Sequence, residues 1–173
     1  MKLEKLNTWL TFAGNIAILL GLVAVAIEIN DNTRAMRAQE LGALEEMDQN
    51  LQIAALDQQF MRVWAKSLTE PERMNLDEIL VATEFIVIFL NNLERAQSAY
   101  LAGVITEDDW HERLFTAPVF LGTKFGQTVW KNIQTDYSNR PGFLDSVNQS
   151  LKNSPVKPDD VFFLDLQQQL QQP

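Results

Sequence analysis

The sequence contains no cysteine and only one histidine, His111, among its 173 residues. Without cysteine the chain can form no disulfide, no thiolate metal site and no cysteine nucleophile. Basic residues are also scarce, with 14 Lys and Arg against 23 Asp and Glu and a formal net charge of −9. Because binding to a phosphate backbone draws on clustered Lys and Arg, this balance argues against a nucleic-acid partner.

Recognised catalytic and cofactor-binding signatures are missing as well. Gly122-Thr123-Lys124 lacks the preceding glycine and the spacing of a P-loop, and no GxSxG or HExxH motif occurs. One acidic cluster invites a metal-site interpretation, but its spacing matches no ligand pattern and helix capping explains it more simply. That cluster comprises Glu107, Asp108, Asp109, His111 and Glu112. We therefore predict that the protein is not an enzyme and has no catalytic residue, cofactor or metal.

A long stretch without charge lies near the N-terminus, where residues 8–27 read TWLTFAGNIAILLGLVAVAI. Roughly twenty helical residues span a hydrocarbon core about 30 Å thick. Trp9 suits the headgroup layer and Glu28 marks the return to water. The pattern predicts a tail at residues 1–7 and a transmembrane helix at residues 8–28, with the lipid bilayer as a partner. A cleaved signal peptide is the alternative, because Ala24-Val25-Ala26 has the small-residue spacing of a cleavage site, although the apolar run is longer than usual.

Small residues recur on one face of this segment, at Ala13, Ala17, Gly21 and Ala24. Such residues let a second helix approach closely in a membrane, so they form a possible helix-association face. We predict self-association or association with another membrane protein through it. Orientation is undecided by charge, because Lys and Arg are equally frequent before the span (Lys2, Lys5) and just after it (Arg34, Arg37).

After the span, the sequence to Leu68 has no proline and only one glycine, so it predicts a continuous stalk helix over residues 29–68. Thr69 and Pro71 then predict the start of a helical bundle domain, residues 69–153. The run ILVATEFIVIFL is too short to span a bilayer and predicts the most buried helix of that domain, ending at Gly103.

Further helices are expected in the second half of the chain. Thr106 and Asp109 predict a capped helix reaching Phe115, and another is expected from Pro118 to about Tyr137. Residues 154–173 are predicted to form a linker and a C-terminal amphipathic segment. No alternating apolar pattern is long enough for a sheet, so the predicted fold class is all-α.

Three polar residues on the apolar helix form a possible polar core site: Glu84, Asn91 and Glu94. A buried carboxylate there could have a raised pKa or could face a ligand pocket. The simpler interpretation is that a Trp, Tyr or Arg side chain satisfies these groups by hydrogen bonding.

Several short segments resemble a widespread group of uncharacterised bacterial single-span membrane proteins. The similarity extends to about Leu151 and rests on INDNTRAMRAQE, PERMNLDEIL, the run from Glu94 through Tyr100 to Gly103, Asp108 and Trp110, then Gly126, Trp130, Tyr137 and Phe143. The resemblance implies a single-pass protein of the bacterial inner (cytoplasmic) membrane with a small helical, cytoplasmic C-terminal domain. Arg95, Gln97 and Ser98 depart from the Asn and Tyr residues common in the group, so any pocket shared near Glu94 is altered here.

Three functions follow as hypotheses. The first is a membrane-anchored helical protein that acts as an oligomeric scaffold or docks a partner at the membrane surface. The second is a ligand-binding membrane sensor with a pocket in the bundle near Glu84, Asn91 and Glu94. The third is an unrecognised membrane-bound enzyme that uses Glu94 or His111 with Arg95 as an electrostatic partner, which requires these groups to converge in one cleft.

Overall fold

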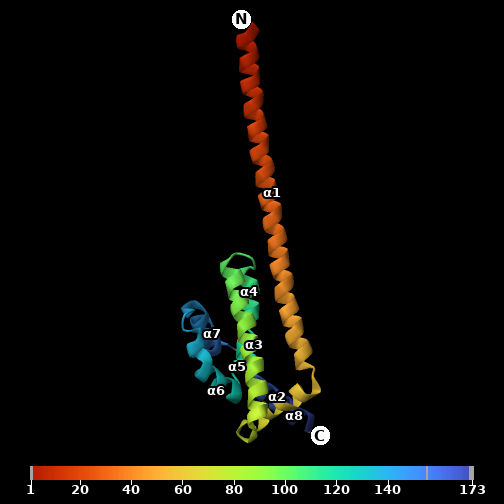
Figure 1. Cartoon of the computed structure of the whole chain (residues 1–173). Coiled ribbons are helices and arrows are strands. Elements are labelled where there is room, and N and C mark those ends of the chain that lie inside the picture. Colours follow the sequence, from red (N-terminus) through yellow and green to blue (C-terminus); the bar gives the residue numbers. More distant parts are fainter. Residues whose placement is uncertain (1, 155, 172–173) are drawn as a thin grey trace. The chain divides into compact units, whose positions relative to one another are not determined.

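A computed structural model describes residues 2–154 and 156–171, and every regular element in these residues is helical (Figure 1). The predicted all-α fold class is therefore confirmed. The chain divides into two compact units, Met1–Glu40 and Leu41–Pro173. Helix α1 (Lys2–Ala55) supplies the first unit, and its end from Leu41 onward belongs to the second.

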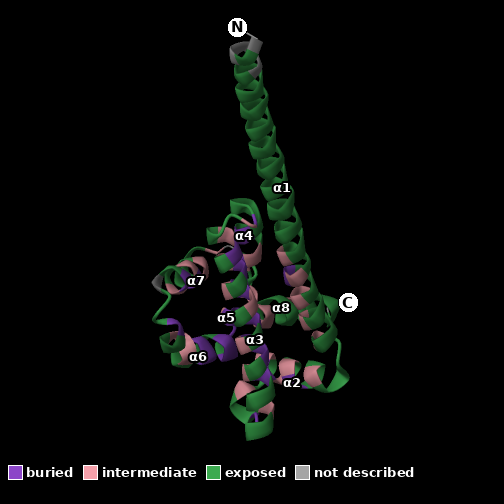
Figure 2. Ribbon diagram, turned by 45° about the horizontal axis from the view of Figure 1, so that its top comes forward, coloured by how far each residue is buried: buried purple, intermediate pink, exposed green. Residues whose placement is uncertain are grey.

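The first unit is a single helix whose described side chains are almost all exposed, as Figure 2 shows in green. From Asn7 onward this helix is long and apolar enough to cross a membrane, and none of its most apolar window is buried. The Thr11 and Thr33 hydroxyls donate to the carbonyls of Asn7 and Ile29 at 3.0 and 2.7 Å, so both are satisfied within the helix. A signal sequence meets the same criteria of length and composition, so a membrane span stays a prediction.

The predicted stalk is interrupted, which corrects the expectation of one helix through Leu68. Helix α1 ends at Ala55, and a new helix, α2 (Gln58–Thr69), begins after Asp57. The Asp57 carboxylate accepts hydrogen bonds from the backbone N–H groups of Gln59 and Phe60, each at 2.9 Å. An N-cap aspartate of this kind satisfies donors that have no partner inside the new helix, so it stabilises the break.

The start of the next long helix also differs from the prediction. Thr69 is the last residue of α2 and donates to the carbonyl of Ala65, so it caps nothing. After the short 3-10 turn η1 (Pro71–Arg73), Asn75 caps α3 (Leu76–Leu101). Asn75 and Glu78 form a reciprocal capping box at 2.8 and 3.0 Å. The predicted glycine stop is confirmed, because Gly103 follows the C-cap with φ +68°.

Shorter helices complete the second unit: α4 (Glu107–Leu114), α5 (Ala117–Leu121), α6 (Lys124–Ile133), η2 (Gln134–Tyr137), α7 (Pro141–Asn153) and α8 (Asp159–Gln171). The Thr106–Asp109 capping box is confirmed. The single helix expected from Pro118 is wrong, because Thr123 caps a second helix there. A Cβ added at Gly126 would lie 2.0 Å from the carbonyl oxygen of Phe120, so the α5–α6 corner requires glycine.

Helix α3 runs through the middle of the second unit and packs against α2, α4 and α6 (Figure 1). One side of it is buried, with Ala82, Ile86 and Leu90 fully enclosed. Leu80 and Ile88 on its other side are 59% and 44% exposed, so the prediction of a buried helix holds for one side only. The core is completed by Leu44 from the end of α1 and by Phe143 and Val147 from α7.

Two aspartates attach the C-terminal helix α8 to this core. The Trp64 indole N–H donates to Asp159 Oδ2 at 3.2 Å, and the Lys124 backbone N–H at the start of α6 donates to Asp160 Oδ2 at 3.0 Å. Burial raises the pKa of the Asp159 carboxyl; the Trp64 hydrogen bond opposes this and the neighbouring Asp160 adds to it. Because the pKa is raised in the folded state, α8 docking strengthens as the pH falls through the folded-state pKa toward the ordinary pKa of an aspartate. Phe162 and Phe163 remain about half exposed on this helix.

Candidate functional site

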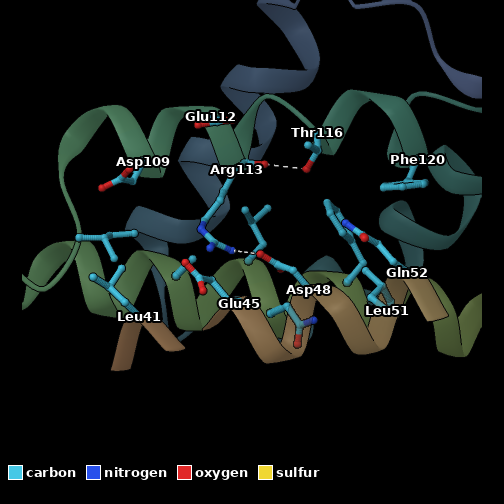
Figure 3. A pocket seen from close by; sticks show the side chains of 15 residues that line it. Leu41, Glu45, Asp48, Leu51, Gln52, Asp109, Glu112, Arg113, Thr116 and Phe120 are labelled. Carbon is cyan, nitrogen blue, oxygen red and sulfur yellow. Dashed lines mark hydrogen bonds and ion pairs between the residues drawn. The ribbon is translucent and has the colours of Figure 1, made fainter. Parts of the chain in front are cut away.

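A cleft of about 510 Å³ lies inside the second unit, between the end of α1, the middle of α3 and helix α4 (Figure 3). Its apolar part is formed by seven side chains: Leu41, Leu51, Phe89, Leu93, Ala96, Ile105 and Phe120. The Phe89 and Phe120 rings pack edge to face with centroids 4.9 Å apart, which fixes one end of the cleft. The volume falls in the range typical of pockets for small molecules, about 300–1,000 Å³.

An ion pair crosses this cleft. The Arg113 guanidinium on α4 donates to the Asp48 carboxylate on α1, and the two side chains point toward one another in Figure 3. Asn92 on α3 donates to the backbone carbonyl of Met47 at 3.5 Å. Arg113 is 24% exposed and Asp48 is 41% exposed, so solvent screens the pair and its main role is to position α1 against α4.

Three further carboxylates line the same cleft: Glu45, Asp109 and Glu112. Asp109 is engaged at the start of α4, where the Thr106 hydroxyl and backbone N–H hold the pKa of its carboxyl below its usual value. Glu45 and Glu112 are exposed, and no ion pair within residues 2–154 and 156–171 involves either of them. The cleft therefore combines an apolar floor with a rim of net negative charge.

The predicted polar core residues lie elsewhere. The Tyr137 hydroxyl donates to Asn91 Oδ1 at 3.2 Å, and Glu94 forms an ion pair with Arg140. Both residues therefore attach the connection between α6 and α7 to α3, and burial raises the pKa of the Tyr137 hydroxyl. Glu84 lies exposed two turns before Asn91. Asn91 and Glu94 therefore contact the same connecting segment through different partners, and none of the three predicted residues lines the cleft.

The groups considered for catalysis are held by different partners. Glu94 is paired with Arg140, whereas His111 on α4 lies 3.5 Å from Glu107 on the exposed face of the same helix. Within the part of the chain that the structure describes, no group of three or more His, Asp or Glu side chains is placed to hold a metal ion. The acidic cluster at the start of α4 divides accordingly: Asp109 caps the helix, and Glu112 is one of the residues that line the cleft.

Sequence reasoning missed the cleft. Arg113 and Asp48 are separated by 65 positions, and neither stands in a recognisable motif. Leu44 and Leu51 lie seven residues apart, and this heptad spacing indicates a packed helix face but does not identify its partner. The residues opposite that face belong to α3 and α4, and only the tertiary fold brings them there.

The small residues of the possible helix-association face lie where helical geometry places them. At about 100° per residue, Ala13, Ala17, Gly21 and Ala24 fall within an arc of about 80° on α1. All four are exposed in the first unit. A Cβ added at Gly21 would meet nothing within 4 Å, so this unit leaves the face open.

These features define the class of the protein as an all-α helical bundle with one candidate membrane-spanning helix. Comparison of the chain with family models, with curated proteins and with solved structures finds no match. The likeness to bacterial single-span membrane proteins consequently stays a prediction, and function has to be argued from the residues themselves.

Proposed function

We propose that this protein is a single-pass membrane protein whose helical unit serves as an oligomeric scaffold or partner-docking module at the surface of a bacterial inner membrane. The observation that supports the anchor is the exposure of large apolar side chains along α1. Twelve of them between Trp9 and Ile29 are at least 41% exposed. At roughly 2 kcal/mol for each such side chain, leaving them in water would cost on the order of 20 kcal/mol, so a lipid or protein environment is required.

The scaffold or docking role is supported by apolar surface beyond the anchor. In the second unit, Leu76 and Leu80 on α3 and Phe162 and Phe163 on α8 are between 49% and 69% exposed. Neighbouring apolar side chains on one helix face favour contact with another protein surface rather than with water. The small-residue face of α1 offers a route to self-association inside the bilayer.

Self-association through α1 can be tested by making the same Ala-to-Leu change at two positions on opposite faces of the helix. Ala17→Leu adds bulk on the predicted face, whereas Ala26→Leu adds the same bulk on the opposite side of the helix, about 180° away. Overpacking a close helix contact typically costs about 1–3 kcal/mol. We therefore expect Ala17→Leu to lower the association constant of the dimer by about tenfold or more. Chemical crosslinking and native mass spectrometry of the full chain in mild detergent measure this constant. Equal effects of both variants, or a wild-type chain that is only monomeric, would contradict association through this face.

Orientation supplies a second test. We propose that the helical unit is cytoplasmic on the strength of the resemblance, because the Lys and Arg residues on the two sides of the span balance one another. The chain contains no cysteine, so single cysteines introduced at exposed positions report sidedness without background. In intact spheroplasts, a membrane-impermeant maleimide is expected to label Leu3→Cys but not Gln49→Cys until the membrane is permeabilised. The reverse labelling pattern would place the helical unit outside.

A ligand-binding sensor is the second candidate function, and the cleft of about 510 Å³ favours it. The predicted location of such a pocket, near Glu84, Asn91 and Glu94, receives no support, because the cleft lies between α1, α3 and α4. A ligand in this cleft would contact the end of α1 directly through Glu45 and Leu51. Ligand binding could therefore change how firmly the end of α1 is held in the second unit.

A further inference from the structure

The cleft is asymmetric in its chemistry. Figure 3 shows Glu45, Asp48 and Arg113 between the facing helices, with Leu51 and Phe120 further along. Asp48 is neutralised by Arg113, and Asp109 is committed to the capping box. Glu45 and Glu112 consequently provide negative charge that no basic side chain in the described residues balances. A ligand that complements the cleft should carry positive charge at one end and apolar surface at the other.

A compact metal ion does not fit this description. Mg²⁺ and Ca²⁺ require several oxygen ligands that converge at about 2.0–2.6 Å. The carboxylates of the cleft do not converge in this way, since no group of three or more His, Asp or Glu side chains in the described residues could hold a metal. Carboxylates spread along a rim instead favour a cation whose charge is bulky or carried by a longer molecule. The floor, which includes Phe89 and Leu93, adds apolar contact that a bare ion cannot use.

We infer that this cleft binds a small organic cation: a protonated amine attached to an aliphatic or aromatic body. The ammonium group would lie at the rim near Glu45 and Glu112, and the apolar body would lie along Leu93, Phe89 and Phe120. The rim charge then contributes selectivity for the cation, and the floor contributes most of the affinity through apolar burial. This inference rests on the ligand-binding function proposed for the cleft and names the ligand class. It is independent of whether α1 self-associates.

The test uses three probes that share one apolar body and differ in charge. These are 4-phenylbutylamine, the neutral 4-phenyl-1-butanol and the anionic 4-phenylbutyrate. Each is titrated into the full-length protein in nanodiscs of zwitterionic phosphatidylcholine, and binding is followed by saturation-transfer-difference NMR. Empty nanodiscs correct for partition into lipid. We expect the amine to bind about tenfold more tightly than the alcohol, and the carboxylate to bind more weakly than both.

Matched variants test whether Glu45 and Glu112 cause the preference for the amine. Glu45→Gln and Glu112→Gln are each expected to weaken binding of the amine by about two- to fivefold, the range of a partly exposed ion pair, and to leave the alcohol unaffected. Glu46→Gln removes the same charge from the adjacent position of α1, which does not line the cleft, and is expected to change nothing. All of these glutamates are exposed, so folding is not at risk.

The possible results distinguish a failure of the cation inference from a failure of the ligand-binding function. Equal binding of the three probes, or binding of the amine that is insensitive to both Glu45→Gln and Glu112→Gln, would overturn the cation inference while leaving a ligand-binding cleft. Tightest binding by 4-phenylbutyrate would overturn it in favour of an anion held by Arg113. No binding of any probe above the empty-nanodisc control would overturn both the inference and the ligand-binding function.

Discussion

Two arginines placed in the middle of the predicted membrane span of α1 are expected to release the protein from membranes. Leu19 and Val23 are 62% and 50% exposed in the first unit, so neither contributes to a protein core whose loss could confuse the result. An arginine at the centre of a membrane helix costs about 2.5–3.5 kcal/mol on insertion scales. Leu19→Arg together with Val23→Arg therefore removes about 6 kcal/mol or more of insertion free energy, which is a factor of at least 10⁴ in the partition constant.

Alkaline carbonate extraction of cell membranes measures this effect. The wild-type chain is expected in the membrane pellet, and the double variant in the supernatant or among degraded chains. Met36→Arg with Gln39→Arg serves as the matched control, because it adds the same charges to exposed positions of α1 beyond the span and should leave the protein in the pellet. A wild-type chain that carbonate extracts, or whose intact mass shows loss of residues up to Ala26, would support the cleaved signal peptide instead.

The sequence predicted best those features that depend on neighbouring residues. The Thr106–Asp109 capping box and the glycine stop at Gly103 are both local, because each is decided by hydrogen bonds or dihedral angles within about four residues. The long apolar helix that includes residues 8–27 was equally easy to predict, since its length and its absence of charge are both visible in the sequence. The all-helical composition follows from many such local signals.

The predicted helix boundaries were wrong where two capping signals lie close together in the sequence. Thr69 with Pro71 looked like a helix start, but Asn75 with Glu78 lies just downstream and forms the box that the structure uses. The break at Asp57 was not predicted because apolar residues continue on both sides of it, although aspartate is itself one of the preferred N-cap residues. In each case the choice depends on whether the apolar face downstream can reach the core, which is a property of the tertiary fold.

The candidate site could not have been predicted from the sequence. Its ion pair joins Asp48 to Arg113 across 65 positions, and the polar residues singled out on α3 turned out to attach a connecting segment through Tyr137 and Arg140. A polar residue in an apolar helix signals that it has a partner but does not say which one. Because neither Asp48 nor Arg113 stands in a recognised motif, only the packing of α1, α3 and α4 reveals where an open, charged surface remains.

Truncation of Phe143 is expected to cause the largest loss of stability in the second unit. This side chain is fully buried on α7, and its ring lies 5.2 Å from that of Tyr137. Replacing a buried phenylalanine by alanine typically costs about 3–5 kcal/mol, because apolar contact is lost and a cavity remains. Phe115→Ala is the matched control, since Phe115 is 55% exposed and the same truncation there should cost less than about 1 kcal/mol. Urea unfolding of the full chain in mild detergent, followed by tryptophan fluorescence, measures both.

The two large effects should also be independent of each other. The first unit and the second unit are each compact by themselves, and Phe143 belongs to the second while Leu19 and Val23 belong to the first. Phe143→Ala is therefore expected to unfold the helical unit at lower urea while the protein still resists carbonate extraction. The Leu19→Arg, Val23→Arg variant is expected to lose the membrane while any chain recovered keeps the urea midpoint of the wild type. If loss of Phe143 also released the chain from membranes, the anchor would depend on the folded unit, and α1 alone would not account for membrane attachment.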